Sequence, residues 1–151
     1  MNTFERKLVE TGNYPLTARK VSVLLISIGY KCDLRCTHCY VDASPDRPEE
    51  MSLETVNKIL NVMKKSDAIE AIDITGCAPE LNPHYKYLIS SVTAFGKKVM
   101  VRSNLTVLSQ PGMEDVPEMW AENRIKVFVS LPCFTEQGVD SQRGKAHTIR
   151  Q

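Results

Sequence analysis

The sequence has no excess of charge of one sign and no long apolar run. Its 151 residues carry 19 lysines and arginines against 18 aspartates and glutamates, a net charge of +1. Such a balance disfavours binding to nucleic acid or to an anionic membrane surface. The longest apolar run, residues 21–28, is too short to span a bilayer, and residues 1–20 lack the apolar stretch of a secretory signal. We therefore expect a cytoplasmic protein with neither nucleic-acid nor membrane partners.

Cysteines are few and unevenly placed. There are five, an odd number, and Cys32, Cys36 and Cys39 lie within eight residues of one another. The other two, Cys77 and Cys133, stand alone. A disulfide framework is typical of an oxidising compartment and an even, spaced set of cysteines, so this pattern favours metal-binding or catalytic thiols.

Four short runs rich in valine, isoleucine and phenylalanine predict strands at residues 21–28, 71–75, 98–102 and 126–131. Three of them are continuous apolar runs, which is typical of strands buried on both faces. Helical patterns separate the strands. This alternation predicts an α/β fold made of βαβ units with a parallel sheet.

The helix boundaries rest on capping residues. Ser52 is a suitable N-cap for a first helix, and Asn82, followed by a proline, predicts the N-cap of a second. A shorter helix is expected over residues 117–122, and Arg143 with Gly144 is expected to open a further one. Residues 146–151 show no amphipathic pattern. Because parallel βα folds bind ligands at the carboxyl ends of their strands, the segments after each strand are the ones to inspect.

The strongest chemical signal is Cys32-Asp-Leu-Arg-Cys36-Thr-His-Cys39, directly after the first predicted strand. Three thiolates in one loop can hold an iron–sulfur cluster, and a [4Fe–4S] cube with three protein ligands keeps one iron open for chemistry. A zinc site completed by His38 is an alternative, but no second pair of cysteines follows at zinc spacing. Inert buried cysteines are the other alternative, and the polar neighbours of the three disfavour it.

Cys-x₃-Cys-x₂-Cys after the first strand of a βα repeat resembles the signature of the radical S-adenosylmethionine (SAM) superfamily. The resemblance implies that the open iron binds SAM and that one electron cleaves it to methionine and a 5′-deoxyadenosyl radical. In this family the residue before the third cysteine is often aromatic and contacts the adenine through its backbone. Here it is His38.

Further SAM contacts are implied after the next three strands. The second ends in a segment similar to the family's Gly-Gly-Glu-Pro turn, the third runs into polar residues, and the fourth ends at a serine that resembles a ribose contact. The residues concerned are Thr75, Gly76, Ala78 and Glu80, then Arg102, Ser103 and Asn104, and finally Ser130. Cys77 lies within the second segment and could be a fourth cluster ligand, a reactive thiol or a small residue in a tight turn. We favour the tight turn.

Four longer strings, at residues 74–83, 101–108, 130–134 and 139–144, are similar to the arsenosugar-biosynthesis (radical SAM/Cys-rich) proteins. Relatives commonly have glycine where this chain has Cys77. The resemblance implies a small-molecule substrate, a methylated arsenic(III) compound that receives the 5′-deoxyadenosyl group. It also implies an electron donor such as flavodoxin or ferredoxin.

The fold implied by the resemblance is a partial (β/α) barrel, the N-terminal four βα units of a radical SAM core. We expect residues 1–20 to form an extension and residues 21–151 to form the core domain, incomplete on its C-terminal side. The family's barrel has further βα units, so the chain has the length of a truncated core. Two other functions stay open, an electron-transfer protein with a four-thiolate cluster and a non-catalytic remnant.

Overall fold

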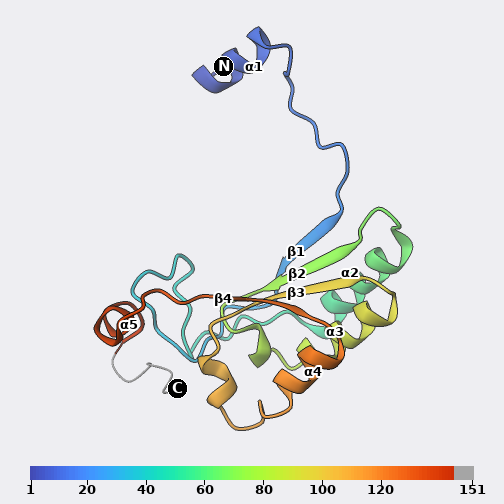
Figure 1. The fold of residues 1–151 in the computed structure, drawn as a ribbon. Coiled ribbons are helices and arrows are strands. Elements are labelled where there is room, and N and C mark those ends of the chain that lie inside the picture. Colours follow the sequence, from blue (N-terminus) through green and yellow to red (C-terminus); the bar gives the residue numbers. More distant parts are fainter. Residues whose placement is uncertain (145–151) are drawn as a thin grey trace.

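The structure is a computed structural model in which residues 1–144 are described (Figure 1). One parallel sheet organises it, with its strands in the order β1-β2-β3-β4. The register pairs Val23 with Ala71, Ala71 with Lys98 and Met100 with Lys126. The strand bounds are β1 (Val23–Ser27), β2 (Ala71–Thr75), β3 (Lys98–Ser103) and β4 (Lys126–Val129). The predicted α/β fold with four parallel strands, a partial barrel, is confirmed.

Helices connect successive strands, as a parallel sheet requires. They are α2 (Leu53–Lys65), α3 (Tyr85–Ala94) and α4 (Val116–Glu122), and α5 (Glu136–Arg143) follows the last strand. Short 3₁₀ turns, η1 (Pro79–Leu81) and η2 (Thr106–Ser109), lie after β2 and β3. The predicted cap at Ser52 is confirmed, because its hydroxyl oxygen accepts the amide hydrogen of Thr55 at 3.3 Å.

The main core lies between the sheet and the helices α2, α3 and α4. Buried apolar residues from every layer meet there, including Met63, Ile72, Leu88 and Val101. At its far end the indole N–H of Trp120 donates to the buried Tyr85 hydroxyl at 2.7 Å, which keeps both polar groups satisfied inside the core.

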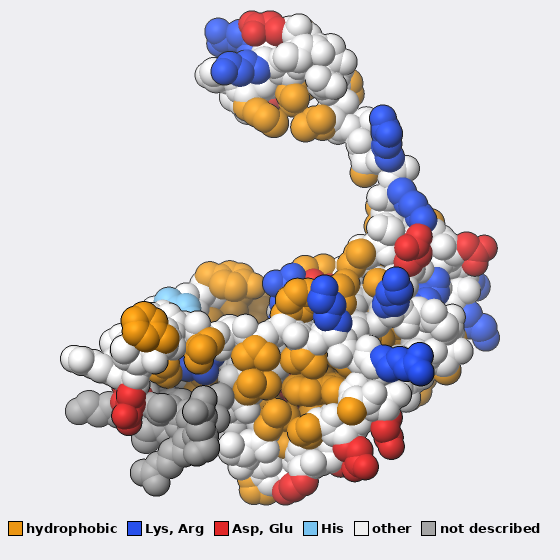
Figure 2. Space-filling view, viewed as in Figure 1, with side chains coloured by type: hydrophobic (Ala, Val, Ile, Leu, Met, Phe, Trp, Pro, Cys, Tyr) orange, Lys and Arg blue, Asp and Glu red, His pale blue; other side chains and the backbone are white. Residues whose placement is uncertain are grey.

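The expectation that three of the strands are buried on both faces is confirmed for β2 alone. Only β2 is buried along most of its length, whereas β3 alternates and β4 is mostly exposed. The cause is that the helices pack against one face of the sheet only, so Val23 and Leu25 of β1 are 45% and 58% exposed on the other. In Figure 2 apolar side chains gather on the face where β4 lies in Figure 1, and those of this strand and the following loop include Phe128, Val129 and Leu131.

Two helix boundaries also differ from expectation. Asn82 does not cap α3, which begins at Tyr85 after His84; its side-chain amide donates instead to the carbonyl oxygen of Ile28 at 2.8 Å and so ties η1 to the end of β1. Arg143 ends α5 and does not open a helix. The expectation for residues 146–151 lies outside the described residues.

The N-terminal helix α1 (Thr3–Glu10) stands away from the sheet at the end of an extended segment (Figure 1). Asn2 and Glu5 form a capping box at its start, and none of its residues is buried. The division into an extension of residues 1–20 and a core of residues 21–151 stays a prediction. Within residues 1–144, no helix is long and apolar enough to cross a membrane.

Candidate functional site

The loop that carries the three clustered cysteines is held by the segment that follows it, residues 41–50, which contains two prolines. Bridges join Gly29 to Glu50 and Lys31 to Ser44. The amide N–H of Cys32 donates to the carbonyl oxygen of Ser44 at 3.1 Å. The segment therefore folds back along the loop and fixes its entry, although it forms no regular strand.

A second, smaller core supports the same loop from below. Leu34, which is only 2% exposed, packs with Ala78 from the turn after β2 and with Val107 from η2. The side chains of Cys32, Cys36, Cys39 and Cys77 pack against this group. Leu34, the apolar residue inside the cysteine motif, thus anchors the loop, and the four cysteines pack around this small core.

Asp33 connects the loop to the end of β3. Its carboxylate accepts the side-chain amide of Asn104 at 2.7 Å and the hydroxyl of Thr106 at 2.5 Å. Leu105, between these two donors, has a left-handed backbone with φ of +62°. That conformation is unusual for a bulky residue, and here it allows both neighbours to reach the same carboxylate.

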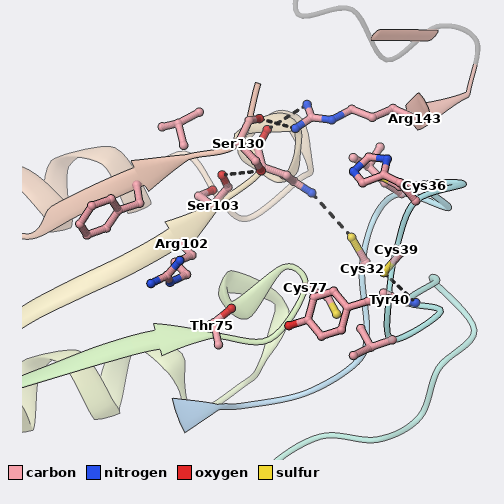
Figure 3. A pocket seen from close by; sticks show the side chains of 17 residues that line it. Cys32, Cys36, Cys39, Tyr40, Thr75, Cys77, Arg102, Ser103, Ser130 and Arg143 are labelled. Carbon is pink, nitrogen blue, oxygen red and sulfur yellow. Dashed lines mark hydrogen bonds between the residues drawn. The ribbon is translucent and has the colours of Figure 1, made fainter. Parts of the chain in front are cut away.

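These elements enclose a cavity of about 380 Å³ at the carboxyl ends of the strands (Figure 3). Its walls come from the cysteine loop, from the ends of all strands except β1 and from α5. The side chains lining it include Cys32, Cys36, His38, Cys39, Tyr40, Thr75, Cys77, Arg102, Ser103, Asn104, Phe128, Ser130 and Arg143. This is where parallel βα folds place their ligands, as the sequence predicted.

Burial favours the neutral form of three thiols in this cavity, those of Cys32, Cys36 and Cys77. Burial raises the pKa of Cys32 to about 12 and the pKa of Cys77 to about 11. Burial also raises the pKa of Cys36, and the guanidinium of Arg143 opposes that rise. A bound metal centre reverses this preference because it deprotonates its thiol ligands.

The donor set fits an iron–sulfur cluster better than a single metal ion. Within residues 1–144, no three His, Cys, Asp or Glu side chains are close enough together to hold one ion, as a zinc site would require. A four-iron cube instead takes its thiolates at separate corners. Two sulfurs also receive hydrogen bonds, Cys39 from the amide of Ala43 at 3.3 Å and Cys32 from the side chain of Asn104 at 3.6 Å. Such donors stabilise thiolates in clusters.

The structure brings most of the predicted SAM contacts into the cavity and keeps three out of it. Gly76, Ala78 and Glu80 do not line it. Gly76 is required by the fold, because a Cβ there would lie 2.7 Å from the backbone nitrogen of Ile28. Ala78 belongs to the small core under the cysteine loop.

Glu80 is buried beneath the cavity, with 4% of its surface exposed. Neither of its carboxylate oxygens has a hydrogen-bond partner among the described residues. Burial raises its pKa, while the nearby Ser103 hydroxyl opposes the rise. The charge of Glu80 in turn adds to the burial that raises the pKa of Tyr85. Burial therefore disfavours the charged form of Glu80 in the folded protein.

Arg102 and Arg143 both line the cavity, but only Arg102 forms an ion pair with a carboxylate of residues 1–144. The guanidinium of Arg102 is paired with the buried carboxylate of Asp73, at 2.8 Å, and stacks on Phe128. Arg143 is only 4% exposed and has no carboxylate partner among residues 1–144. Its guanidinium donates to two backbone carbonyls, that of Asn104 at 3.4 Å and that of Ser130.

Sequence reasoning missed Arg143 as a site residue, because its role depends on how α5 docks. The carbonyl of Gln142 accepts the amide of Thr37 at 2.9 Å, which fixes the end of α5 against the cysteine loop. Sequence reasoning also missed Tyr40 as a residue that lines the cavity. Its position directly after Cys39 was the one feature of the sequence that could have indicated this. A buried cation with no carboxylate partner among residues 1–144 would be stabilised by an anionic ligand group.

Known proteins similar to this chain agree with this architecture. The family model described as the Radical SAM superfamily matches residues 26–151. The antilisterial bacteriocin subtilosin biosynthesis protein AlbA of Bacillus subtilis (strain 168) is 26% identical over 122 residues, which cover 81% of this chain and 27% of that protein. This chain thus spans about a quarter of the length of that relative.

Two crystal structures of Streptococcus suis SuiB share the fold. The one bound to S-adenosylmethionine has a TM-score of 0.68 at 17% identity and covers 92% of this chain and 32% of that one. The one bound to the precursor peptide SuiA has a TM-score of 0.68 at 19% identity and covers 92% and 30%. None of these relatives is named for arsenic chemistry. The chain belongs to the radical SAM superfamily.

Proposed function

We propose that the cavity binds a [4Fe–4S] cluster through Cys32, Cys36 and Cys39 and binds SAM beside it. The observation that carries the proposal is the convergence on one cavity of three thiols and a buried guanidinium that has no carboxylate partner among residues 1–144, in a chain of this superfamily. When bound, the cluster supplies the electron that cleaves SAM to methionine and a 5′-deoxyadenosyl radical.

The residues around the cluster have distinct tasks in this proposal. Asn104 and the amide of Ala43 hold negative charge on two of the sulfurs by donating hydrogen bonds to them. Asp33 orients Asn104 by accepting from its side-chain amide. Leu34 anchors the loop, so the three thiolates keep their places when SAM enters or leaves.

Arg143 is proposed to receive the carboxylate of SAM. Its guanidinium donates to two carbonyls and has no ion pair with a carboxylate of residues 1–144, so an ionised ligand group would supply a counter-charge. Ser103, Ser130, Thr75 and the backbone at His38 are proposed to position the rest of SAM, as they line the same cavity. Arg102 is proposed to shape the wall, because Asp73 already neutralises it.

Anaerobic reconstitution with iron and sulfide tests the cluster. The wild-type chain is expected to turn brown and to hold close to four irons. Replacing Cys32, Cys36 or Cys39 by alanine is expected to abolish this, because two irons would then lack a protein ligand. Cys133→Ala is the matched control, since Cys133 lies outside the cavity. Equal iron loss in the control would overturn the assignment of the ligands.

For the reaction itself we propose transfer of the 5′-deoxyadenosyl group to a methylated arsenic(III) compound, a step of arsenosugar biosynthesis. The C–S bond of SAM would break and a C–As bond would form, and the one electron used to cleave SAM would be returned, so that the transfer consumes no net electron and leaves methionine. The support is the similarity of residues 74–83 and 139–144 to that group of proteins. An external electron donor such as flavodoxin or ferredoxin is proposed to reduce the cluster. Incubation of the reduced, loaded protein with SAM and trimethylarsine or dimethylarsinous acid should yield a 5′-deoxyadenosyl arsenical by mass spectrometry.

A second candidate substrate is a peptide. It is supported by the names of the relatives, a bacteriocin biosynthesis protein and a SuiB structure bound to its precursor peptide. SAM cleavage stimulated by a peptide and not by an arsenical would favour it. Cluster loading without any SAM cleavage would instead favour the electron-transfer function or the non-catalytic remnant.

A further inference from the structure

Cys77 holds the fourth thiol of the cavity on a strained backbone. It follows β2 directly and has φ of +63°, in the left-handed region that glycine adopts freely and other residues adopt at a cost. Gly76 before it has φ of +124° and is packed too tightly against Ile28 and Gly29 to accept a Cβ. The turn is therefore set by Gly76, and a glycine at position 77 would fit it with less strain than a cysteine.

The strained position places the Cys77 thiol among the other three. All four thiols line the same cavity, and Cys77, which is labelled in Figure 3, interacts with Cys39. Besides burial, the interactions with Cys39 and Cys36 contribute to the raised pKa of Cys77, and Cys77 contributes to that of Cys32. A tight turn alone does not need a thiol here, whereas a ligand role accounts for the strain.

We propose that Cys77 is a displaceable fourth ligand of the cluster, one that binds the open iron when SAM is absent and yields it when SAM binds. This inference rests on the proposed cluster. On binding iron the thiol releases its proton to solvent, and on displacement by the amino and carboxylate groups of SAM the thiolate takes up a proton. No electron is transferred in either direction.

A cluster whose four irons all have a thiolate ligand resists oxidative loss of iron. The rate of iron loss therefore tests the proposal without an activity assay. The variants are Cys77→Gly, which relieves the backbone strain and so folds at least as well as wild type, and Cys133→Ala as the control. After loading without SAM, each protein is treated with ferricyanide and the [3Fe–4S] EPR signal is followed. We expect Cys77→Gly to lose its fourth iron about ten-fold faster than wild type, as an open iron is the labile one.

Thiol mapping gives a second readout. Iodoacetamide labelling of Cys77 is compared in cluster-free and loaded wild-type protein without SAM, with Cys133 as the reference thiol. Loading is expected to slow the labelling of Cys77 and to leave that of Cys133 unchanged. SAM titrations followed by EPR should show tighter binding to Cys77→Gly than to wild type, because SAM no longer competes with the thiolate. Equal iron loss in wild type and Cys77→Gly, or labelling of Cys77 that loading does not slow, would overturn the proposal.

Failure of the proposed function gives different results. If no variant loads iron, the cluster proposal fails and the ligand proposal with it. If wild type loads iron but SAM perturbs only the Cys77→Gly spectrum, Cys77 is a ligand but a permanent one. The chain would then be an electron-transfer protein, and the displaceable role would be overturned.

Discussion

Replacing Arg143 by glutamine tests most directly whether the charge that α5 places in the cavity contributes to SAM binding. The side chain is almost completely buried and carries a charge with no carboxylate partner among residues 1–144. Glutamine keeps a donor and much of the length but removes the charge. The variant therefore separates the guanidinium's attraction for an anionic ligand from its packing.

The magnitude follows from the contacts. One charge-assisted hydrogen bond to a ligand carboxylate contributes about 1.5–3 kcal/mol, so SAM should bind about 10- to 150-fold more weakly to Arg143→Gln. The free energy of unfolding of the cluster-free chain should change little. Loss of the donors to the carbonyls of Asn104 and Ser130 destabilises the fold, but removal of a buried charge that has no carboxylate partner among residues 1–144 stabilises it.

The assay is a SAM titration of the reduced, cluster-loaded protein followed by EPR, with urea unfolding of the cluster-free chain beside it. Arg143→Lys serves as the control, because it keeps the charge but loses the forked geometry, and it should bind SAM with intermediate affinity. An Arg143→Gln protein that loads four irons and binds SAM within two-fold of wild type would refute the role of this residue.

Two further predictions concern the turn after β2. Gly76→Ala should destabilise the chain by at least about 2 kcal/mol in urea unfolding, because its Cβ would lie 2.7 Å and 2.8 Å from the backbone nitrogens of Ile28 and Gly29. Gly96→Ala, which also has a positive φ but open space, should cost clearly less. Glu80→Gln should stabilise the chain at pH 8 but not at pH 4. Burial raises the pKa of Glu80 above its usual 4.5, so its contribution to stability is present at low pH and lost as the pH rises through the raised value. The same stability difference at both pH values would contradict this.

Local patterns were sufficient for much of this protein. The spacing of Cys32, Cys36 and Cys39 identified the superfamily, because a loop of eight residues carries all three ligands of the proposed cluster. The sequence also predicted the capping hydroxyl of Ser52 and the order of strands and helices. Both features depend on residues that are close together in the sequence. The position of the cavity followed from the chirality and direction of βα units.

Other features depended on contacts between distant segments. Asn82 is a suitable helix cap by type, yet its side chain is bound to Ile28, 54 residues earlier in the chain. Arg143 entered the site because α5 docks on the cysteine loop, and Arg102 was neutralised by Asp73 from the neighbouring strand. Cys77 looked like a small turn residue until its left-handed backbone and its place beside three thiols were known. Partners far apart in sequence leave no periodic signal, so only the tertiary structure decides which polar groups are satisfied and which are free to bind a ligand.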